Sequence, residues 1–235
     1  MSPSAYTVED QQRMTRARNY FAWQARLILP EVGRRVLEIG CGIGNFTRLL
    51  ADREAVIAID SEPACIDLLK SATPPGAAAI HAFSIDAASD GILSLARFHP
   101  DSCLFLNVLE HIEDDHGTLR RIASILPPQG RIVILAPACA SLYGPIDRNL
   151  GHHRRYTRAS LRRLARGAGL HIRKMRYVNT LGFFGWWINA HILRRTAQSE
   201  SQIELFDRLV PVLSRIESIV PPPFGQSLFA VFEKP

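Results

Sequence analysis

The sequence predicts an α/β protein with one mostly parallel sheet that carries helices on both faces. Three observations lead to this prediction. Apolar, strand-like runs alternate with helical patterns from residue 35 to 137. A glycine-rich turn, Gly40–Gly44, follows the first of these runs, and polar residues follow later ones at Asp60, Asp86 and Asn107. Because ligands of parallel α/β sheets bind at the carboxyl ends of the strands, we expect these residues to share one site.

Length and composition fit one decorated domain. The chain has 235 residues, of which 47% are hydrophobic and 21% charged, as in a globular protein. Its net charge is +6, and the excess is arginine, because Lys70, Lys174 and Lys234 are its only lysines. Such a charge suits anionic lipid, nucleic acid or an acidic substrate, or simply solvated helix faces.

Cysteine usage and hydropathy point to a cytoplasmic protein. The four cysteines show no C-x-x-C spacing, so we expect reduced thiols and no metal site. The first residues lack the apolar core of a signal peptide. The longest apolar stretch, residues 181–193, is too short to cross a bilayer, which needs about 20 residues, although it could lie in a membrane interface.

The first half of the chain alternates helix and strand. A helix is expected from Thr7 to about Leu29, capped by Thr7 and ended by Pro30. The aromatic residues of this helix could pack on the sheet. Alternatively, residues 1–30 could form a lid that covers the ligand. The following elements are expected as strands at 35–39, 55–60 and 78–83, helices at 45–52 and 62–71, and an irregular or helical segment at 88–98.

The second half carries the same alternation and then a long insertion. The expected elements are strands at 102–106, 131–137, 170–178 and 227–232, and helices at 116–126 and 160–168. Residues 180–224 are far longer than a hairpin loop, so we expect an inserted cap with a helix up to Arg195 and an amphipathic helix at 203–220. The whole chain is expected to be one domain.

The glycine turn differs from a dinucleotide loop. Gly40, Gly42 and Gly44 read G-x-G-x-G, whereas the dinucleotide pattern is G-x-G-x-x-G. Glu38 precedes the first glycine, where a carboxylate would repel a pyrophosphate but would suit a cationic amine. Asp60 lies about 20 residues after the turn, where a carboxylate can accept ribose hydroxyls; it could equally be a helix cap. A nucleoside ligand with a positive charge fits this set best.

The string from Leu37 to Thr47, LEIGCGIGNFT, closely resembles the first motif of class I S-adenosylmethionine (SAM)-dependent methyltransferases. The Leu-Glu-His-Ile string at 109–112 and the turn before the strand at 131–137 resemble the same family. The resemblance implies a seven-stranded sheet whose last strand is antiparallel, with a SAM-binding core at 34–179 and 226–233. It also implies the cofactor-binding residues, which are Tyr20, Glu38, Gly40, Cys41, Gly42, Gly44, Asp60, Asp86 and Asn107.

The loop at 138–157 is expected to choose the acceptor, because it leaves the sheet on the ligand side. It is rich in groups that bind or move protons, and histidine suits general-base work near neutral pH. The candidate catalytic residues are His152, His153 and Tyr156, and the candidate acceptor-binding residues are Tyr143, Asp147, Arg154 and Trp186. A plain polar loop that packs on the next helix is the structural alternative.

The expected reaction is methyl transfer from SAM to an oxygen, nitrogen or carbon of a small molecule that is hydrophobic, lipid-linked or anionic. Residues 107–110 lack the Asn-Pro-Pro-Tyr type of motif found in DNA and several RNA methyltransferases, so no nucleic-acid partner is expected. The alternatives are an NAD-dependent oxidoreductase, an RNA methyltransferase, and a non-catalytic SAM-binding or membrane-peripheral protein. Peripheral membrane contact through 181–195 and homodimer formation stay open.

Overall fold

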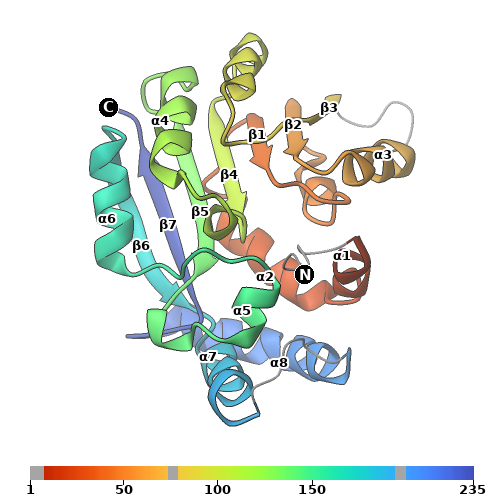
Figure 1. Cartoon of the computed structure of the whole chain (residues 1–235), viewed down its shortest axis with the longest axis vertical. Helices are drawn as coiled ribbons and strands as arrows, with labels where there is room; N and C mark the ends of the chain where they lie inside the picture. The colour runs from red at the N-terminus through yellow and green to blue at the C-terminus, as the bar shows by residue number, and fades with distance from the viewer. Residues whose placement is uncertain (1–7, 74–78, 194–199) are drawn as a thin grey trace.

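The computed structural model describes residues 8–73, 79–193 and 200–235, which form one twisted sheet with helices on both faces (Figure 1). The strands are β1 (Arg35–Ile39), β2 (Ala55–Asp60), β3 (Ala79–Ser84), β4 (Ser102–Leu106), β5 (Arg131–Pro137), β6 (His171–Val178) and β7 (Ser227–Glu233). The α-helices are α1 (Val8–Met14), α2 (Arg18–Ile28), α3 (Pro63–Ala72), α4 (Asp115–Ile125), α5 (Pro145–Asn149), α6 (Arg158–Gly167), α7 (Thr180–Trp187) and α8 (Glu200–Ile219).

The strand order is β3-β2-β1-β4-β5-β7-β6. Strands β1 to β5 are parallel, and β7 lies antiparallel between β5 and β6. The chain proceeds outward from β1 to β3 and then returns to β4 on the other side of β1. The switch point therefore lies between β1 and β4, which is where α/β sheets bind ligands. Both the predicted fold and the antiparallel last strand are confirmed.

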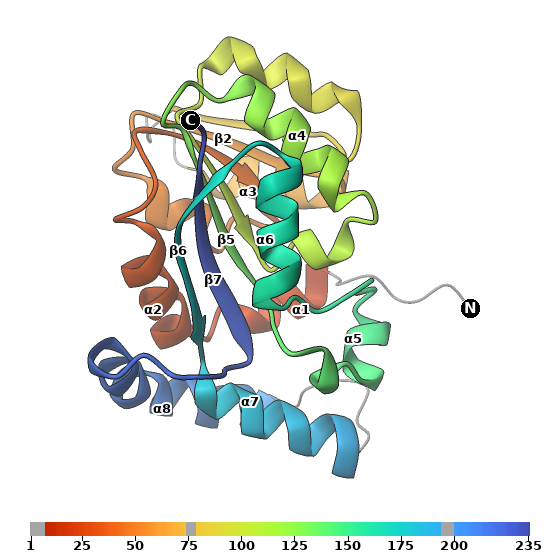
Figure 2. The same cartoon turned by 90° about the vertical axis from the view of Figure 1, so that its left-hand side faces the viewer.

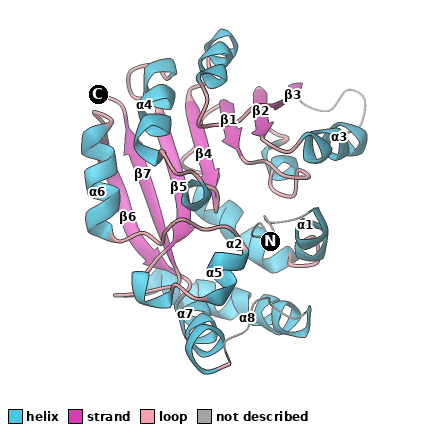
Figure 3. Ribbon diagram, in the orientation of Figure 1, coloured by secondary structure: helices cyan, strands magenta, loops and turns pink. Residues whose placement is uncertain are grey.

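Alternate residues of each strand face two separate cores. Leu37 and Ile39 of β1 pack with residues of α4 and α6, whereas Val36 packs with Trp23 and Ile28 of α2. Figure 3 shows the sheet running between these helical layers. Both sides of β1, β2, β4, β5 and β7 are buried, which explains the nearly continuous apolar sequence of these strands.

Three local elements differ from the expectation. The predicted N-terminal helix is two helices, because α1 packs on the glycine turn while α2 packs on the sheet. The predicted helix at 45–52 is one 3₁₀ turn, η1 (Thr47–Leu50). The loop at 138–157 contains the 3₁₀ turn η4 (Ala140–Leu142) and α5, which begins at Pro145, a residue whose fixed φ suits a first helical turn.

The remaining short helical turns are η2 (Asp90–Phe98), η3 (Leu109–His111) and the π-helical turn η5 (Ile188–Ile192) that continues α7. Helix α7 packs across η4 and α5, and α8 packs on α2 (Figure 2). Within the described residues, no helix is both long and apolar enough to cross a membrane. The predicted insertion thus divides: α7 packs on the loop at 138–157, and α8 packs on α2. Arg194 and Arg195, expected beside this apolar segment, lie outside the described residues.

Candidate active site at the carboxyl edge of the sheet

The turn after β1 has a backbone conformation that requires glycine. Gly40, Gly42 and Gly44 have φ values of +67°, +54° and +84°, in the left-handed region that side chains resist. A Cβ at Gly40 would strike Val108, and one at Gly42 would strike Gln11. The turn therefore needs glycine both for conformation and for close packing.

The backbone amides from Cys41 to Gly44 each donate to a protein acceptor. The Cys41 amide donates to the Ile59 carbonyl at 3.0 Å and the Gly44 amide to the Cys41 carbonyl at 3.0 Å. The Gly42 amide donates to the Asp60 carboxylate at 2.8 Å. The Ile43 amide donates to the Gln11 side chain at 2.8 Å. A pyrophosphate would need free amides here, so the turn is built for another group.

Glu38 presents a buried carboxylate just below this turn. Its side chain is 2% exposed, and its Oε2 atom has no hydrogen-bond partner. Burial, opposed in part by the neighbouring Thr47 and assisted by the charge of Asp60, raises the pKa of Glu38 to about 7. An unpartnered buried carboxylate is costly, and a cationic ligand would supply the missing interaction.

The two aspartates at the neighbouring strand ends sit in turns. The Asp60 carboxylate, which ends β2, accepts the amides of Gly42 and Glu62 at 2.8 and 2.9 Å. Asp86 follows β3, is exposed, and accepts the Ala88 amide at 2.8 Å. These hydrogen bonds fix the orientation of each carboxylate, and its remaining lone pairs can accept hydrogen bonds from a ligand.

Asn107 closes the site on the β4 side. It adopts φ +53°, and its amide donates to the Leu135 carbonyl at 2.7 Å. Burial raises the pKa of the Tyr20 phenol to about 12, and the neighbouring side chains of Asn107 and Gln24 oppose this rise in part. Tyr20 is therefore a neutral hydroxyl that connects α2 to the end of β4.

Gln11 was not predicted from the sequence. It is buried in α1, accepts from the Ile43 amide, and donates to the Cys65 thiol at 3.5 Å. The backbone carbonyl of Gln11 also accepts from the Asn45 side chain at 2.9 Å. A glutamine in a polar helix gives no signal in sequence, because only the packing of α1 on the turn brings it there.

In the acceptor loop, Asp147 is the central buried residue. Its carboxylate accepts Nδ1 of His152 and Nε of Arg155, both at 2.8 Å. It also accepts the Gly144 amide at 3.0 Å and the indole N–H of Trp186 at 3.2 Å. Burial alone would raise the pKa of Asp147, but His152 and Arg155 outweigh it and hold that pKa below its usual value. Asp147 thereby joins α5, the loop and α7.

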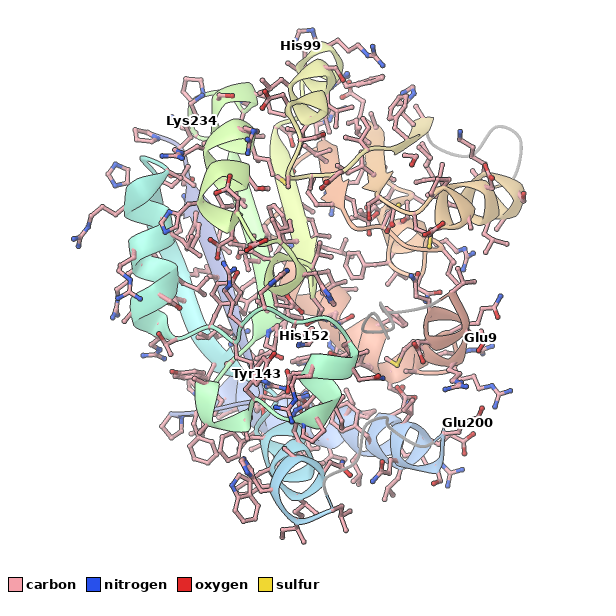
Figure 4. All side chains as sticks on the ribbon, in the orientation of Figure 1. Glu9, His99, Tyr143, His152, Glu200 and Lys234 are labelled. Atoms are coloured by element: carbon pink, nitrogen blue, oxygen red, sulfur yellow. The ribbon has the colours of Figure 1, made fainter. Side chains whose placement is uncertain are left out.

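The other predicted residues of this loop divide between buried and exposed positions. The Tyr156 hydroxyl is in the core and donates toward the Leu109 carbonyl and the Asp115 carboxylate, at 3.0 and 2.9 Å. Arg154 pairs with Asp115 at 2.7 Å. His153 is exposed, and Figure 4 shows Tyr143 beside His152, whose carbonyl accepts the tyrosine hydroxyl at 2.8 Å.

Glu110 and His111, which follow β4, lie beside His152 of the loop. Glu110 is 1% exposed, and neither of its carboxylate oxygens has a hydrogen-bond partner. Burial, countered in part by Arg155, raises the pKa of Glu110 to about 8. The ring of His111 lies 4.7 Å from that of His152, and burial, with a smaller effect of the neighbouring histidines, lowers the pKa of His111 to about 4.

The glycine turn, the strand-end polar residues and the strand order define the class I methyltransferase fold. A family model described as a methyltransferase domain matches residues 9–174, which is well over half of the chain. The chain therefore belongs to the methyltransferase-domain family, as the sequence motifs predicted.

Individual relatives agree with this assignment. A ubiquinone biosynthesis O-methyltransferase from Aeromonas salmonicida is 28% identical over 163 residues, which cover 61% of this chain and 65% of that protein, just under two thirds of its length. A SAM-dependent methyltransferase from Archaeoglobus fulgidus superposes with a TM-score of 0.60 at 20% identity, covering 93% and 94% of the two chains. A Haloferax volcanii methyltransferase solved with the Trm112 activator gives 0.64 at 20% identity, covering 97% and 96%. These likenesses confirm the fold.

Proposed function

We propose that this protein transfers the methyl group of SAM to a small-molecule acceptor. The observation that carries the proposal is Glu38, a buried carboxylate with an unpartnered oxygen beneath the glycine turn. The amino group of SAM is a cation of the kind that such a carboxylate binds.

The residues around the turn fit the parts of this cofactor. Glu38 and the turn Gly40–Gly44, with Cys41, would hold its methionine part. Asp60 would accept the ribose hydroxyls, Asp86 would accept the adenine amino group, and Asn107 with Tyr20 would close the pocket. SAM supplies an electrophilic methyl on its sulfonium; the protein aligns the acceptor and excludes water.

An oxidoreductase that uses NAD fits the same residues poorly. The four amides from Cys41 to Gly44 already donate to protein acceptors, so none is directed at a pyrophosphate. In addition, the turn leads into one 3₁₀ turn rather than into a long helix whose N-terminus could bind phosphate. The negative charge of Glu38 would oppose such a ligand.

Titration calorimetry with SAM, S-adenosylhomocysteine and NAD tests the cofactor. We expect SAM and S-adenosylhomocysteine to bind at one site per chain and NAD to give no heat. The variant Glu38→Gln, which keeps the shape but removes the charge, should bind SAM at least tenfold more weakly. Binding of NAD without binding of SAM would overturn the proposal.

We propose the loop at 138–157 as the acceptor site, with an oxygen as the methylated atom. The name of the Aeromonas relative, an O-methyltransferase, supports an oxygen acceptor, and a hydrophobic, lipid-linked or anionic molecule suits the loop. Exposed His153 is our candidate general base. Tyr143, Asp147, His152 and Tyr156 position the loop. Arg154 lies in the loop and pairs with Asp115, and Trp186 of α7 contacts it through Asp147.

An assay of S-adenosylhomocysteine release with a panel of phenolic acceptors tests the loop. His153→Ala should lower turnover at least tenfold while SAM affinity stays within twofold of wild type. Unchanged turnover would remove His153 from the mechanism.

We further infer peripheral membrane contact through residues 181–195. The supporting observation is a row of exposed apolar side chains on α7 and η5: Phe184 is 51%, Trp187 44% and Ile192 61% exposed. The net charge of +6 favours an anionic lipid surface. A second copy of the chain is the competing occupant of this face.

Flotation with vesicles containing anionic lipid separates the two occupants. Wild-type protein should float with the vesicles, and Trp187→Ala should float less because Trp187 is exposed. Trp186 is buried, so its replacement would not test contact with a membrane. A protein that stays unbound but runs as a dimer in light scattering would assign the face to self-association.

A further inference from the structure

A second cluster of polar side chains lies where the loop at 138–157 passes η3. Glu110 and His111 follow β4 in η3, and His152 comes from the loop after α5. One ligand atom from each of these three side chains lies within 4.8 Å of the other two. Residues more than 40 positions apart in the chain thus bring two imidazoles and a carboxylate together.

Hydrogen bonding fixes which atom of His152 faces this cluster. Its Nδ1 lies 2.8 Å from the Asp147 carboxylate, so Nδ1 carries the proton. In the neutral ring, Nε2 then presents a lone pair, and it faces Oε1 of Glu110 at 4.0 Å. Two acceptors that face each other in the interior require a positive charge between them.

Glu110 supplies the second, independent observation. It is 1% exposed, yet both carboxylate oxygens lack a hydrogen-bond partner. Buried polar groups are nearly always paired, so an unpaired carboxylate beside a free imidazole nitrogen points to an absent cation. In the described part of the chain, no neighbouring cation is left to pair with Glu110, because Arg155 already pairs with Asp147 at 2.8 Å.

We propose that Glu110, His111 and His152 bind one divalent transition-metal ion of the zinc class. Two imidazoles and one carboxylate match the ligand preference of zinc, and three protein ligands leave a fourth position for water or an acceptor oxygen. Asp147 acts as the outer partner that orients His152, in the carboxylate–histidine–metal arrangement of many zinc sites. This inference does not depend on the identity of the cofactor.

The experiment uses the full chain, stripped with a chelator and dialysed. Titration calorimetry with zinc chloride should show about one equivalent bound per chain, and cobalt(II) should give the visible absorption of a low-coordinate site. Glu110→Gln and His111→Gln should each weaken metal binding at least tenfold. Asp147→Asn should weaken it by about 10–100-fold, the effect of losing an outer partner.

Two matched variants serve as controls. Glu113→Gln changes an exposed carboxylate three residues from Glu110, and His153→Gln changes the exposed histidine next to His152. Both should bind zinc as wild type does. Circular dichroism checks that every variant is folded, which matters most for Asp147 because it also holds Arg155 and Trp186.

Two results would overturn the proposal. The stripped wild-type protein could take up no stoichiometric metal, or Glu110→Gln and His111→Gln could bind zinc as tightly as the controls. Infrared spectra distinguish the remaining explanation: a protonated-carboxyl band that persists at saturating zinc and disappears in Glu110→Gln would show that a proton, and not a metal, occupies the cluster.

Discussion

At the residue scale, Glu38 illustrates how a binding group destabilises the protein that carries it. Its carboxylate is buried with one oxygen unpaired, and its pKa is raised to about 7. A raised pKa means that the folded state prefers the protonated form. This contribution to stability is complete below about pH 4.5 and is lost as the pH rises through 7.

Glu38→Gln should therefore stabilise the ligand-free protein at pH 8. The expected gain is at most about 3 kcal/mol, from the difference between pKa values of about 4.5 and 7. Urea unfolding at pH 8 and pH 5 measures it, and the gain should shrink toward zero at pH 5. An equal effect at both pH values would show that ionisation of Glu38 is not the cause.

The affinity for SAM should depend on pH through the same group. Because only the ionised carboxylate attracts the amino cation, affinity should fall as the pH drops below about 7. Calorimetry from pH 5.5 to 8.5 measures this profile. Glu38→Gln should give weak binding with a flat profile, and a sloping profile in that variant would assign the titration to another residue.

Asp60→Ala should weaken SAM binding by about 1–3 kcal/mol, which is the range for a hydrogen bond to a charged group. The carboxylate also holds the Gly42 amide at 2.8 Å, so part of the loss would come from the turn. Asp60→Asn, which keeps an acceptor for that amide, serves as the matched variant. Equal binding by wild type and both variants would exclude Asp60 from the pocket.

At the scale of elements, α1 contacts the glycine turn through Gln11. The Gln11 side chain accepts from the Ile43 amide and its backbone carbonyl accepts from the Asn45 side chain, and Gln11 is the buried residue of this short helix. Helix α2 is held differently, because its Tyr20 amide and Asn19 bond to Asp207 of α8. Different contacts therefore hold the two helices.

Gln11→Ala should therefore speed the release of SAM several-fold while leaving the unfolding midpoint nearly unchanged. Stopped-flow displacement measures the release rate, and hydrogen exchange of residues 8–14 measures the loosening of α1. Gln12→Ala, an exposed neighbour on the same helix, should behave as wild type.

Gly42→Val should abolish SAM binding. The valine side chain would collide with Gln11, and the backbone at this position has φ +54°, which valine resists.

At the scale of the molecule, the proposed cofactor pocket draws on elements from both ends of the chain. Helix α8 supports α2, which carries Tyr20 to the end of β4, and α7 holds the acceptor loop through Trp186. Ligand binding should consequently stabilise the whole domain and not only the turn. Exposed apolar side chains on α7 and α8 remain on the surface of this unit.

SAM at about 100 times its dissociation constant should stabilise the protein by about 2.7 kcal/mol. For a domain of this size, that corresponds to an increase in Tm of about 5–10 °C. Differential scanning calorimetry with SAM, and with NAD as the matched ligand, measures it. An equal increase with NAD would contradict the proposed cofactor.

Much of this molecule follows from local sequence. Apolar β-branched runs bury both faces of a strand, three closely spaced glycines allow positive φ, and strand order places Glu38, Asp60, Asp86 and Asn107 at one edge. These features depend on neighbours in the chain or on general rules of parallel sheets. The alternation of strands and helices could therefore be predicted from the residues, whereas the antiparallel last strand was predicted from the resemblance of the motifs to a family.

Only the tertiary structure brought together groups that are far apart in the chain. Gln11 lies on the glycine turn, Asp147 joins His152 to Trp186, and Glu110 faces His152, yet no spacing in the sequence relates these residues. Their pairing depends on how α1, η3 and α7 pack, and buried polar groups acquire partners only when packing is complete. The sequence determined the fold and the cofactor edge, whereas packing decided which charges are paired and which await a ligand.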